Sequence, residues 1–218
     1  MNINDLPGYD AAAPLLVVDN LCVTFESFEG EVAAVDGVSF TVNPGETLCI
    51  VGESGSGKSA SQMAIMGLLS TPPALISGSV RFCGIELVHA PQSTLFTVRG
   101  SGVSMIFQDA ITSLNPALKI GFQIAEVFCA RTGSDSASGR KYAIELMERV
   151  AIPGASQRVD DYPFQFSGGM CQRIMIAMAL ALNPKILIAD EPTTALDVTV
   201  QRQVMELLKS LSREADLA

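Results

Sequence analysis

The most constraining feature of the sequence is the eight-residue stretch Gly52–Ser59, which reads Gly-Glu-Ser-Gly-Ser-Gly-Lys-Ser. It fits the pattern G-x-x-x-x-G-K-[ST] at every fixed position. The apolar run over residues 47–51 predicts a buried strand before it, and the helical spacing of residues 60–69 predicts a helix after it. A plain Gly/Ser-rich turn would have no need of Lys-Ser at these positions. The stretch therefore predicts a phosphate-binding loop, in which the glycines let successive backbone N–H groups point inward.

Each part of this loop has an expected role toward a nucleotide. The residues expected to contact the phosphates are Gly52, Glu53, Ser54, Gly55, Ser56, Gly57, Lys58 and Ser59. The Lys58 ammonium would reach the β- and γ-phosphates, and the Ser59 hydroxyl would bind Mg²⁺. The positive end of the following helix would add to the attraction. Phe25 or Phe28, near the end of an early strand, could supply a flat ring for adenine, although a phenylalanine there also suits the core.

Composition narrows the class of protein. The net charge of −9 and the pI near 4.6 argue against a general nucleic-acid binder, which would carry a basic face. The five cysteines are odd in number and scattered, with no C-x-x-C spacing, which favours free thiols in a reducing compartment over disulfides or a metal site. We find no basic and apolar signal sequence, and no apolar run near the ~20 residues that cross a bilayer. The length of 218 residues suits one α/β domain with a subdomain.

The first half of the chain predicts strands around the phosphate loop. Residues 1–13 are expected to form a flexible leader. Residues 15–25 and 33–42 have strand-like apolar runs separated by a turn, so antiparallel strands should precede a mainly parallel α/β core. Residues 104–107 predict a short strand that ends at Gln108.

The middle of the chain predicts an inserted helical subdomain. Residues 121–150 have helical spacing, interrupted at 132–134 by Thr-Gly-Ser. The predicted division is an ATP-binding core with an antiparallel β subdomain over 14–108 and 184–218, and a helical subdomain over 109–183.

Two further motifs follow. Ser167, Gly168, Gly169 and Met170 precede an apolar run, and a hydroxyl with open N–H groups at a helix start is an anion-binding arrangement. Further along, residues 185–189 predict a buried strand that ends in Asp190 and Glu191. Asp190 could hold hydrated Mg²⁺, and Glu191 could polarise a water molecule. Asp197 is the predicted N-cap of the next helix.

These residues in this order resemble the ATP-binding-cassette (ABC) ATPases, and the resemblance covers nearly the whole chain. The matching motifs are Gly52–Ser59 (Walker A), Gln108 (Q-loop), Ser167–Met170 (signature), Ile186–Glu191 (Walker B) and Ala195–Asp197 (D-loop). The segments 112–116 (Thr-Ser-Leu-Asn-Pro) and 189–199 are similar to those of the dipeptide, oligopeptide and glutathione importers.

The resemblance implies a mechanism. Two ABC ATPase subunits, identical or paralogous, would pair head to tail, with each ATP between one Walker A and the other subunit's Ser167–Met170. Gln108 would contact Mg²⁺ and water, Glu191 would be the general base, and Asp197 would belong to the nucleotide-contacting set. The partners would be transmembrane permease subunits and, indirectly, a solute-binding protein, with no nucleic acid. The chain would lie peripherally on the cytoplasmic face of the inner (plasma) membrane and energise import of peptides or similar small solutes.

The resemblance also implies a switch histidine after the D-loop, one helix and strand further on. The only histidine, His89, precedes Gln108 and is expected to be a surface or loop residue. The chain is therefore expected to bind ATP better than it hydrolyses it. The alternative is a truncated nucleotide-binding module with little or no hydrolysis. An ABC-type ATPase of DNA repair or translation is disfavoured by the acidity. The transported substrate and the identity of the partner ATPase stay open.

Overall fold

The structure is a computed structural model that describes residues 3–27, 30–194, 196–215 and 217–218, without the side chain of residue 215. The chain divides into two compact units. The first, which we call the N-terminal unit, comprises Met1–Val103 and Asp216–Ala218. The second, the helical unit, comprises Ser104–Ala215. No helix in the described part of the chain is both long and apolar enough to cross a membrane.

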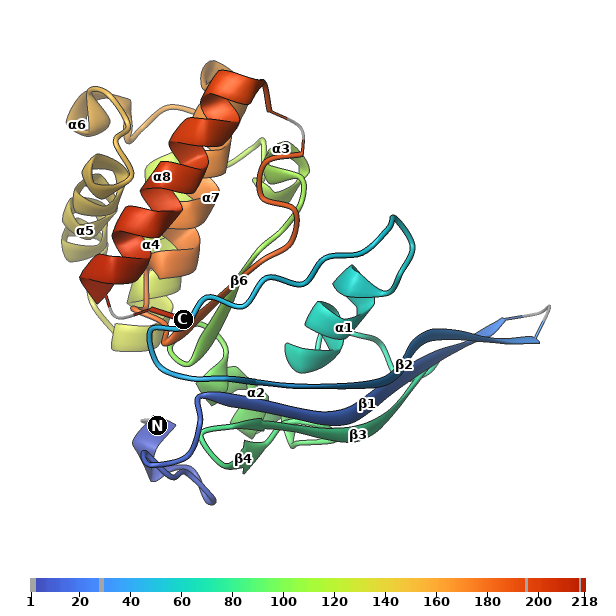
Figure 1. The fold of residues 1–218 in the computed structure, drawn as a ribbon. Helices are drawn as coiled ribbons and strands as arrows, with labels where there is room; N and C mark the ends of the chain where they lie inside the picture. The colour runs from blue at the N-terminus through green and yellow to red at the C-terminus, as the bar shows by residue number, and fades with distance from the viewer. Residues whose placement is uncertain (1–2, 28–29, 195, 216) are drawn as a thin grey trace. The chain divides into compact units, whose positions relative to one another are not determined.

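The N-terminal unit is built on a four-stranded antiparallel sheet in the order β2-β1-β3-β4. Its strands are β1 (Leu16–Ser27), β2 (Gly30–Val42), β3 (Ala74–Phe82) and β4 (Ile85–Glu86). The long strands β1, β2 and β3 lie side by side (Figure 1), with Leu16 of β1 opposite both Val42 and Phe82. Val18, Leu21 and Val23 of β1 are buried, as the apolar pattern requires. The predicted antiparallel strands over 15–25 and 33–42 are confirmed.

Two helices complete the N-terminal unit, α1 (Lys58–Ile65) and α2 (Gln92–Val98). Helix α1 contacts β1 and β2. The residues after its last turn are bound by Arg99, which directly follows α2. The Arg99 guanidinium donates to the carbonyl oxygens of Met66 (2.9 Å) and Gly67 (2.6 Å). A cation at this place compensates the negative end of the helix dipole. The C-terminal end of the helix that begins at Lys58 is therefore fixed.

Residues 1–13 were predicted to form a flexible leader, but the described part of this segment is packed. A 3₁₀ turn, η1 (Ile3–Asp5), opens the segment, and Ile3 and Leu6 are buried. The Asp10 N–H donates to the Cys83 carbonyl oxygen at 2.8 Å. Local polarity misled the prediction, since two isolated apolar side chains show no periodicity but can still anchor a short segment to a folded surface.

The helical unit contains β5 (from Val103 to Ile106, its first residue at the boundary) and β6 (Ile186–Ala189), which pair in a two-stranded sheet. Its helices are α3 (Ala110–Ser113), α4 (Ile120–Thr132), α5 (Ser136–Arg149), α6 (Ala155–Arg158), η2 (Pro163–Gln165), α7 (Gly168–Leu180) and α8 (Val198–Ala215). Helices α4, α5 and α7 pack together around Ile124, Met147 and Ile174, which are fully buried. Gly133, in the left-handed region, ends α4 within the predicted break.

The observed division differs from the predicted one over 14–108, 184–218 and 109–183. It falls between Val103 and Ser104, and β6 and α8 group with the helices. The reason is contact, since β6 pairs with β5, and α8 packs on α7. The fold is α/β, as predicted.

The hairpin after β3 is closed by a carboxylate. One oxygen of Glu86 accepts the N–H groups of Val80, Leu87 and Val88, and the other accepts the Ser79 hydroxyl. Partial burial alone would raise the pKa of Glu86, but these hydrogen bonds outweigh it and lower the pKa below its ordinary value of 4.5. Nearby, the exposed His89 lies in a loop, as expected.

We expect Glu86→Gln to remove part of the acid sensitivity of this protein. Because the folded-state pKa is lowered, the ionised carboxylate contributes stability above its unfolded-state pKa, and that stability is lost as the pH falls through the folded-state value. Chemical denaturation between pH 7 and acid conditions should show a smaller loss below about pH 4.5 in Glu86→Gln than in the wild type. The control is Glu145→Gln, an exposed carboxylate on α5. Identical pH profiles for wild type and Glu86→Gln would contradict the prediction.

Candidate nucleotide-binding site

The phosphate loop leads into α1 and curls around its own lysine. The Lys58 ammonium donates to the carbonyl oxygens of Gly52 (2.9 Å) and Glu53 (2.8 Å). Ser59 is exposed on the first turn of α1. A loop that wraps a lysine and opens a helix can offer backbone N–H groups, an ammonium and a dipole end to one anion.

Gly57 is required because the loop presses against the sheet. This residue is the N-cap of α1 with φ of 88°. A Cβ atom added here would lie 2.0 Å from the Ala34 carbonyl oxygen and 3.3 Å from Val35 Cγ2, both on β2. Gly55, also left-handed at φ of 81°, would place its Cβ in open space. Glycine is therefore needed at Gly55 for its backbone conformation alone, and at Gly57 for its backbone conformation and for the close contact with β2.

The predicted buried strand over residues 47–51 is wrong. These residues form no strand, and neither sheet of the described chain includes them. Leu48, Ile50 and Val51 are 42%, 41% and 87% exposed. An apolar run signals a demand for burial, but a strand also needs a neighbour that satisfies its backbone hydrogen bonds, and the run itself does not specify one.

The two aromatic candidates for adenine stacking stay untested. Phe25 is half-buried in β1, where it pairs with Val32 and Ala74. Phe28 lies outside the described residues. Phe25 therefore remains a prediction that is compatible with its place at the end of a strand.

In the helical unit, Gln108 and Glu191 are brought together. Gln108 follows β5 and Glu191 follows β6, and the Asp190 N–H donates to the Ile106 carbonyl oxygen at 3.0 Å. The carboxyl ends of the two strands are thus adjacent. The Gln108 amide donates to Glu191 Oε2 at 3.0 Å. The predicted base and the predicted Q-loop residue therefore contact each other directly.

Thr194 is a residue that the sequence prediction missed. Its hydroxyl donates to the same Glu191 Oε2 at 3.0 Å, and its N–H donates to the Glu191 carbonyl oxygen at 3.3 Å. Glu191 has a φ of 45°, which is rare for a residue with a side chain. The sequence signal that could have identified Thr194 is a hydroxyl in a turn, three residues after the carboxylate that follows a strand.

Asp190 has the properties of a cation ligand. It is only 5% exposed, and its Oδ1 has no hydrogen-bond partner within the described structure. Buried polar atoms without a partner are uncommon, and a buried carboxylate oxygen is a hard ligand that Mg²⁺ prefers. The Asp190 carboxylate is therefore compatible with the role of Mg²⁺ ligand that the sequence predicted.

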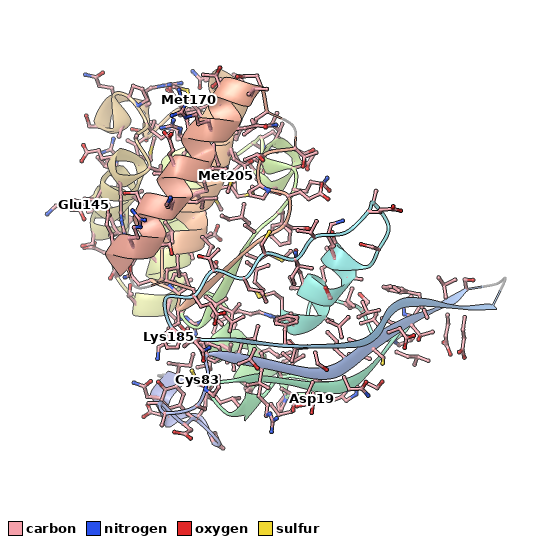
Figure 2. The ribbon with its side chains drawn as sticks, in the orientation of Figure 1. Asp19, Cys83, Glu145, Met170, Lys185 and Met205 are labelled. Carbon is pink, nitrogen blue, oxygen red and sulfur yellow. The ribbon has the colours of Figure 1, made fainter. Side chains whose placement is uncertain are left out.

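The signature residues lie at the start of α7. Ser167 is the exposed N-cap, and its hydroxyl oxygen accepts the Met170 N–H at 3.4 Å. A Cβ atom on Gly169 would lie 2.5 Å from Val200 of α8, so α7 and α8 begin side by side (Figure 1). Figure 2 labels Met170 at this end.

Asp197 is the N-cap of α8, as predicted. Its carboxylate accepts the N–H groups of Thr199 and Val200, both at 3.1 Å. The signature and the D-loop residue Asp197 therefore lie at one end of the same helix pair, whereas the phosphate loop belongs to the N-terminal unit.

The chain belongs to the ABC transporter family, whose family model matches residues 35–194. The structure is similar to that of the ATP-binding cassette MJ0796, solved as a dimer in a post-hydrolysis state bound to ADP and Pi, with a TM-score of 0.78 and 31% sequence identity. That match covers 91% of this chain and 83% of the other. The fold is thus that of an ABC ATPase.

Closer sequence relatives are named for peptide transport. The oligopeptide transport ATP-binding protein OppD of Bacillus subtilis is 51% identical over 203 residues, which are 93% of this chain and 57% of that protein. The dipeptide transport ATP-binding protein DppD of Escherichia coli is 48% identical over 204 residues, which are 94% of this chain and 62% of that protein. The chain therefore spans about three fifths of the length of these relatives.

We expect Gly57→Ala to destabilise the protein more than Gly55→Ala. Both substitutions place a side chain in the left-handed region, which costs about 1–2 kcal/mol. Only Gly57→Ala also drives a methyl group into the Ala34 carbonyl oxygen, and overpacking of this kind costs a further ~1–3 kcal/mol. Chemical denaturation of the two variants measures the difference in the free energy of unfolding. Equal losses would show that contact with β2 does not constrain the loop.

Proposed function

We propose that this chain is the ATP-binding and ATP-hydrolysing subunit of a transporter that imports peptides or similar small solutes. One observation carries the proposal, namely the Gln108–Glu191 contact beside the partnerless carboxylate oxygen of Asp190. A fold that needed only stability would not collect these groups at the ends of two strands. Relatives named for oligopeptide and dipeptide transport support the choice of solute. The site of action is the cytoplasmic face of the membrane.

The residues divide the work on MgATP. Lys58 and the N–H groups of the phosphate loop hold the phosphates, while Ser59, Asp190 and Gln108 would hold Mg²⁺. The ion supplies charge that offsets the negative charge of the transferring phosphoryl group. Lys58 must exchange its bonds to Gly52 and Glu53 for bonds to phosphate.

Glu191 is the proposed general base. Its Oε2 accepts from both Gln108 and Thr194, so two donors from different segments orient the carboxylate. Proton transfer to a positioned carboxylate needs a water molecule within hydrogen-bond reach. In this proposal Gln108 would release Glu191 and contact that water, which would couple the Q-loop to the chemistry.

The signature acts on the ATP of a second ABC ATPase subunit. Ser167 is exposed and the start of α7 offers N–H groups, so the motif is available to an anion on another chain. The similar cassette MJ0796 is described as dimeric. Binding of ATP would favour the closed pair and hydrolysis would release it, which is a shift between two populations.

Exchange of Glu191 for glutamine should separate binding from turnover. Glu191→Gln keeps the acceptor for Gln108 and Thr194 but cannot take a proton, so we expect unchanged MgATP affinity and a ~10²–10⁴-fold lower turnover. Lys58→Ala is the contrasting variant, with affinity lowered about tenfold or more through lost charge-assisted hydrogen bonds. Calorimetry and steady-state ATPase assays on the full-length protein measure both. Wild-type turnover in Glu191→Gln would remove Glu191 from the mechanism.

A groove in the helical unit is the proposed docking surface for the permease. It has a volume of about 560 Å³ and lies along α4 and the start of α5, with Phe122, Ala125 and Cys129 among its apolar lining. Phe122 is 54% exposed. The two helices pack closely at Gly139, which has no side chain. A Cβ atom at this position would lie only 2.4 Å from Cys129 Sγ. The groove is therefore a built feature of the packing of α4 on α5.

Charge around the groove suits a peptide segment. At the rim, Asp160 pairs with Arg140 at 2.7 Å and with Lys119 at 3.5 Å. An apolar floor with ionic groups at its edge matches a short amphipathic helix that buries one side and keeps the other polar. Membership in the ABC transporter family supports the proposal that this helix belongs to a permease subunit.

We expect Phe122→Ser to weaken assembly with the permease. Loss of one well-buried aromatic anchor from an interface typically costs ~2 kcal/mol or more, which is over tenfold in affinity. The measurement is co-purification of the full-length protein with the permease subunits of a peptide importer from the same organism. Phe96→Ser is the matched control, since Phe96 is 67% exposed on α2 of the other unit. Equal losses in both variants, or none in Phe122→Ser, would contradict the assignment.

A further inference from the structure

One guanidinium in the helical unit contacts residues on both sides of Ser167, the first residue of the signature. Arg158, the last residue of α6, is 25% exposed at its side chain. Its Nη2 donates to the Gln165 carbonyl oxygen at 2.8 Å, and its Nη1 donates to Met170 Sδ at 3.5 Å. Its Cζ lies 4.0 Å from the centre of the Phe166 ring. Four groups are thus held by one side chain, because Nε also donates to Asp161 at 3.1 Å.

The positions of these partners along the chain define the role of Arg158. Gln165 and Phe166 come directly before Ser167, and Met170 accompanies it in the first turn of α7. Phe166 is buried at 8% exposure, whereas Ser167 is exposed. The guanidinium and the buried Phe166 ring therefore fix residues 165–170 to the interior of the helical unit, while Ser167 is exposed to solvent.

The chemistry of arginine suits this arrangement. A planar guanidinium can stack on an aromatic face and still donate in the plane from several N–H groups. A lysine ammonium could lie over the ring but could not also reach Gln165, Met170 and Asp161 in a fixed fork. The contacts to Gln165 and Met170 cross the N-cap, so they resist rotation of Ser167 relative to α7.

We propose that Arg158 is a positioning residue for the signature and that it acts through Phe166 and Met170. The inference rests on the proposed function, in which Ser167–Met170 contacts the ATP of a second subunit. Its consequence is selective. Loss of Arg158 should weaken ATP-dependent association of two subunits and leave the affinity of one subunit for MgATP intact, because the phosphate loop lies elsewhere in the chain.

The experiment uses the full-length protein in a Glu191→Gln background, which slows ATP turnover. Variants Arg158→Ala, Arg158→Lys and Phe166→Leu are compared with Lys141→Ala. Lys141 is an exposed cation on α5 that pairs with the exposed carboxylate of Glu145, four residues further on. MgATP affinity is measured by calorimetry. Association on ATP is measured by analytical ultracentrifugation, for the chain alone and mixed with a paralogous ABC ATPase from the same organism. Thermal unfolding midpoints identify variants with damaged folds.

We expect Arg158→Ala to weaken ATP-dependent association about tenfold, with MgATP affinity changed less than about twofold. Arg158→Lys should recover part of the association, and Lys141→Ala should behave as the background. Phe166→Leu removes the ring, so its effect and that of Arg158→Ala should be less than additive when they are combined.

Three results would overturn the inference in distinguishable ways. Unchanged association in Arg158→Ala and Arg158→Lys would show that Arg158 does not position the signature. A parallel loss of MgATP affinity and thermal midpoint in both variants would show that Arg158 only supports the fold. Absence of ATP-dependent association in the background protein, alone and with the paralogue, would refute the proposed function itself.

Discussion

The approach of the phosphate loop to β2 is the contact on which the N-terminal unit depends. The absence of a side chain at Gly57 allows the loop to rest against the Ala34 carbonyl oxygen. That contact fixes where α1 begins, and the Arg99 guanidinium fixes where it ends. A helix that is fixed at both ends over a sheet keeps the backbone N–H groups of the loop in one orientation even without a ligand. The entropic cost of ordering the loop is therefore met largely during folding and not during ligand binding.

The helical unit places polar groups where they do not favour stability. A buried carboxylate oxygen without a partner and a left-handed backbone at Glu191 both cost free energy. The surrounding strands and the Gln108 and Thr194 donors confine that cost to the two residues after β6. The unfavourable features thus coincide with the groups that would serve Mg²⁺ and water, which is a common association at functional sites.

Sequence patterns located the chemistry better than the packing. Gly52–Ser59, Asp190 and Glu191 were predicted as site residues because fixed spacing reflects a local backbone requirement. The strand predicted over residues 47–51 and the flexible leader predicted over residues 1–13 differ from the structure, since the structure of both segments depends on partners distant in sequence. Thr194 and Arg158 were missed for a related reason. A threonine in a turn and an arginine at a helix end are ordinary in sequence, and only tertiary contacts reveal what they hold.

The two adjacent helix caps differ in charge. Asp197 places a carboxylate at the start of α8, so the positive end of that helix is already compensated. Ser167 caps α7 with a neutral hydroxyl, so the partial positive charge of α7 is left uncompensated. Both helices begin side by side, so without Asp197 the positive ends of the two helix dipoles would attract an anion about equally. The aspartate therefore leaves the start of α7 as the more electropositive of the two helix ends, and a phosphate that approaches this end of the unit meets one attractive pole beside a repulsive carboxylate.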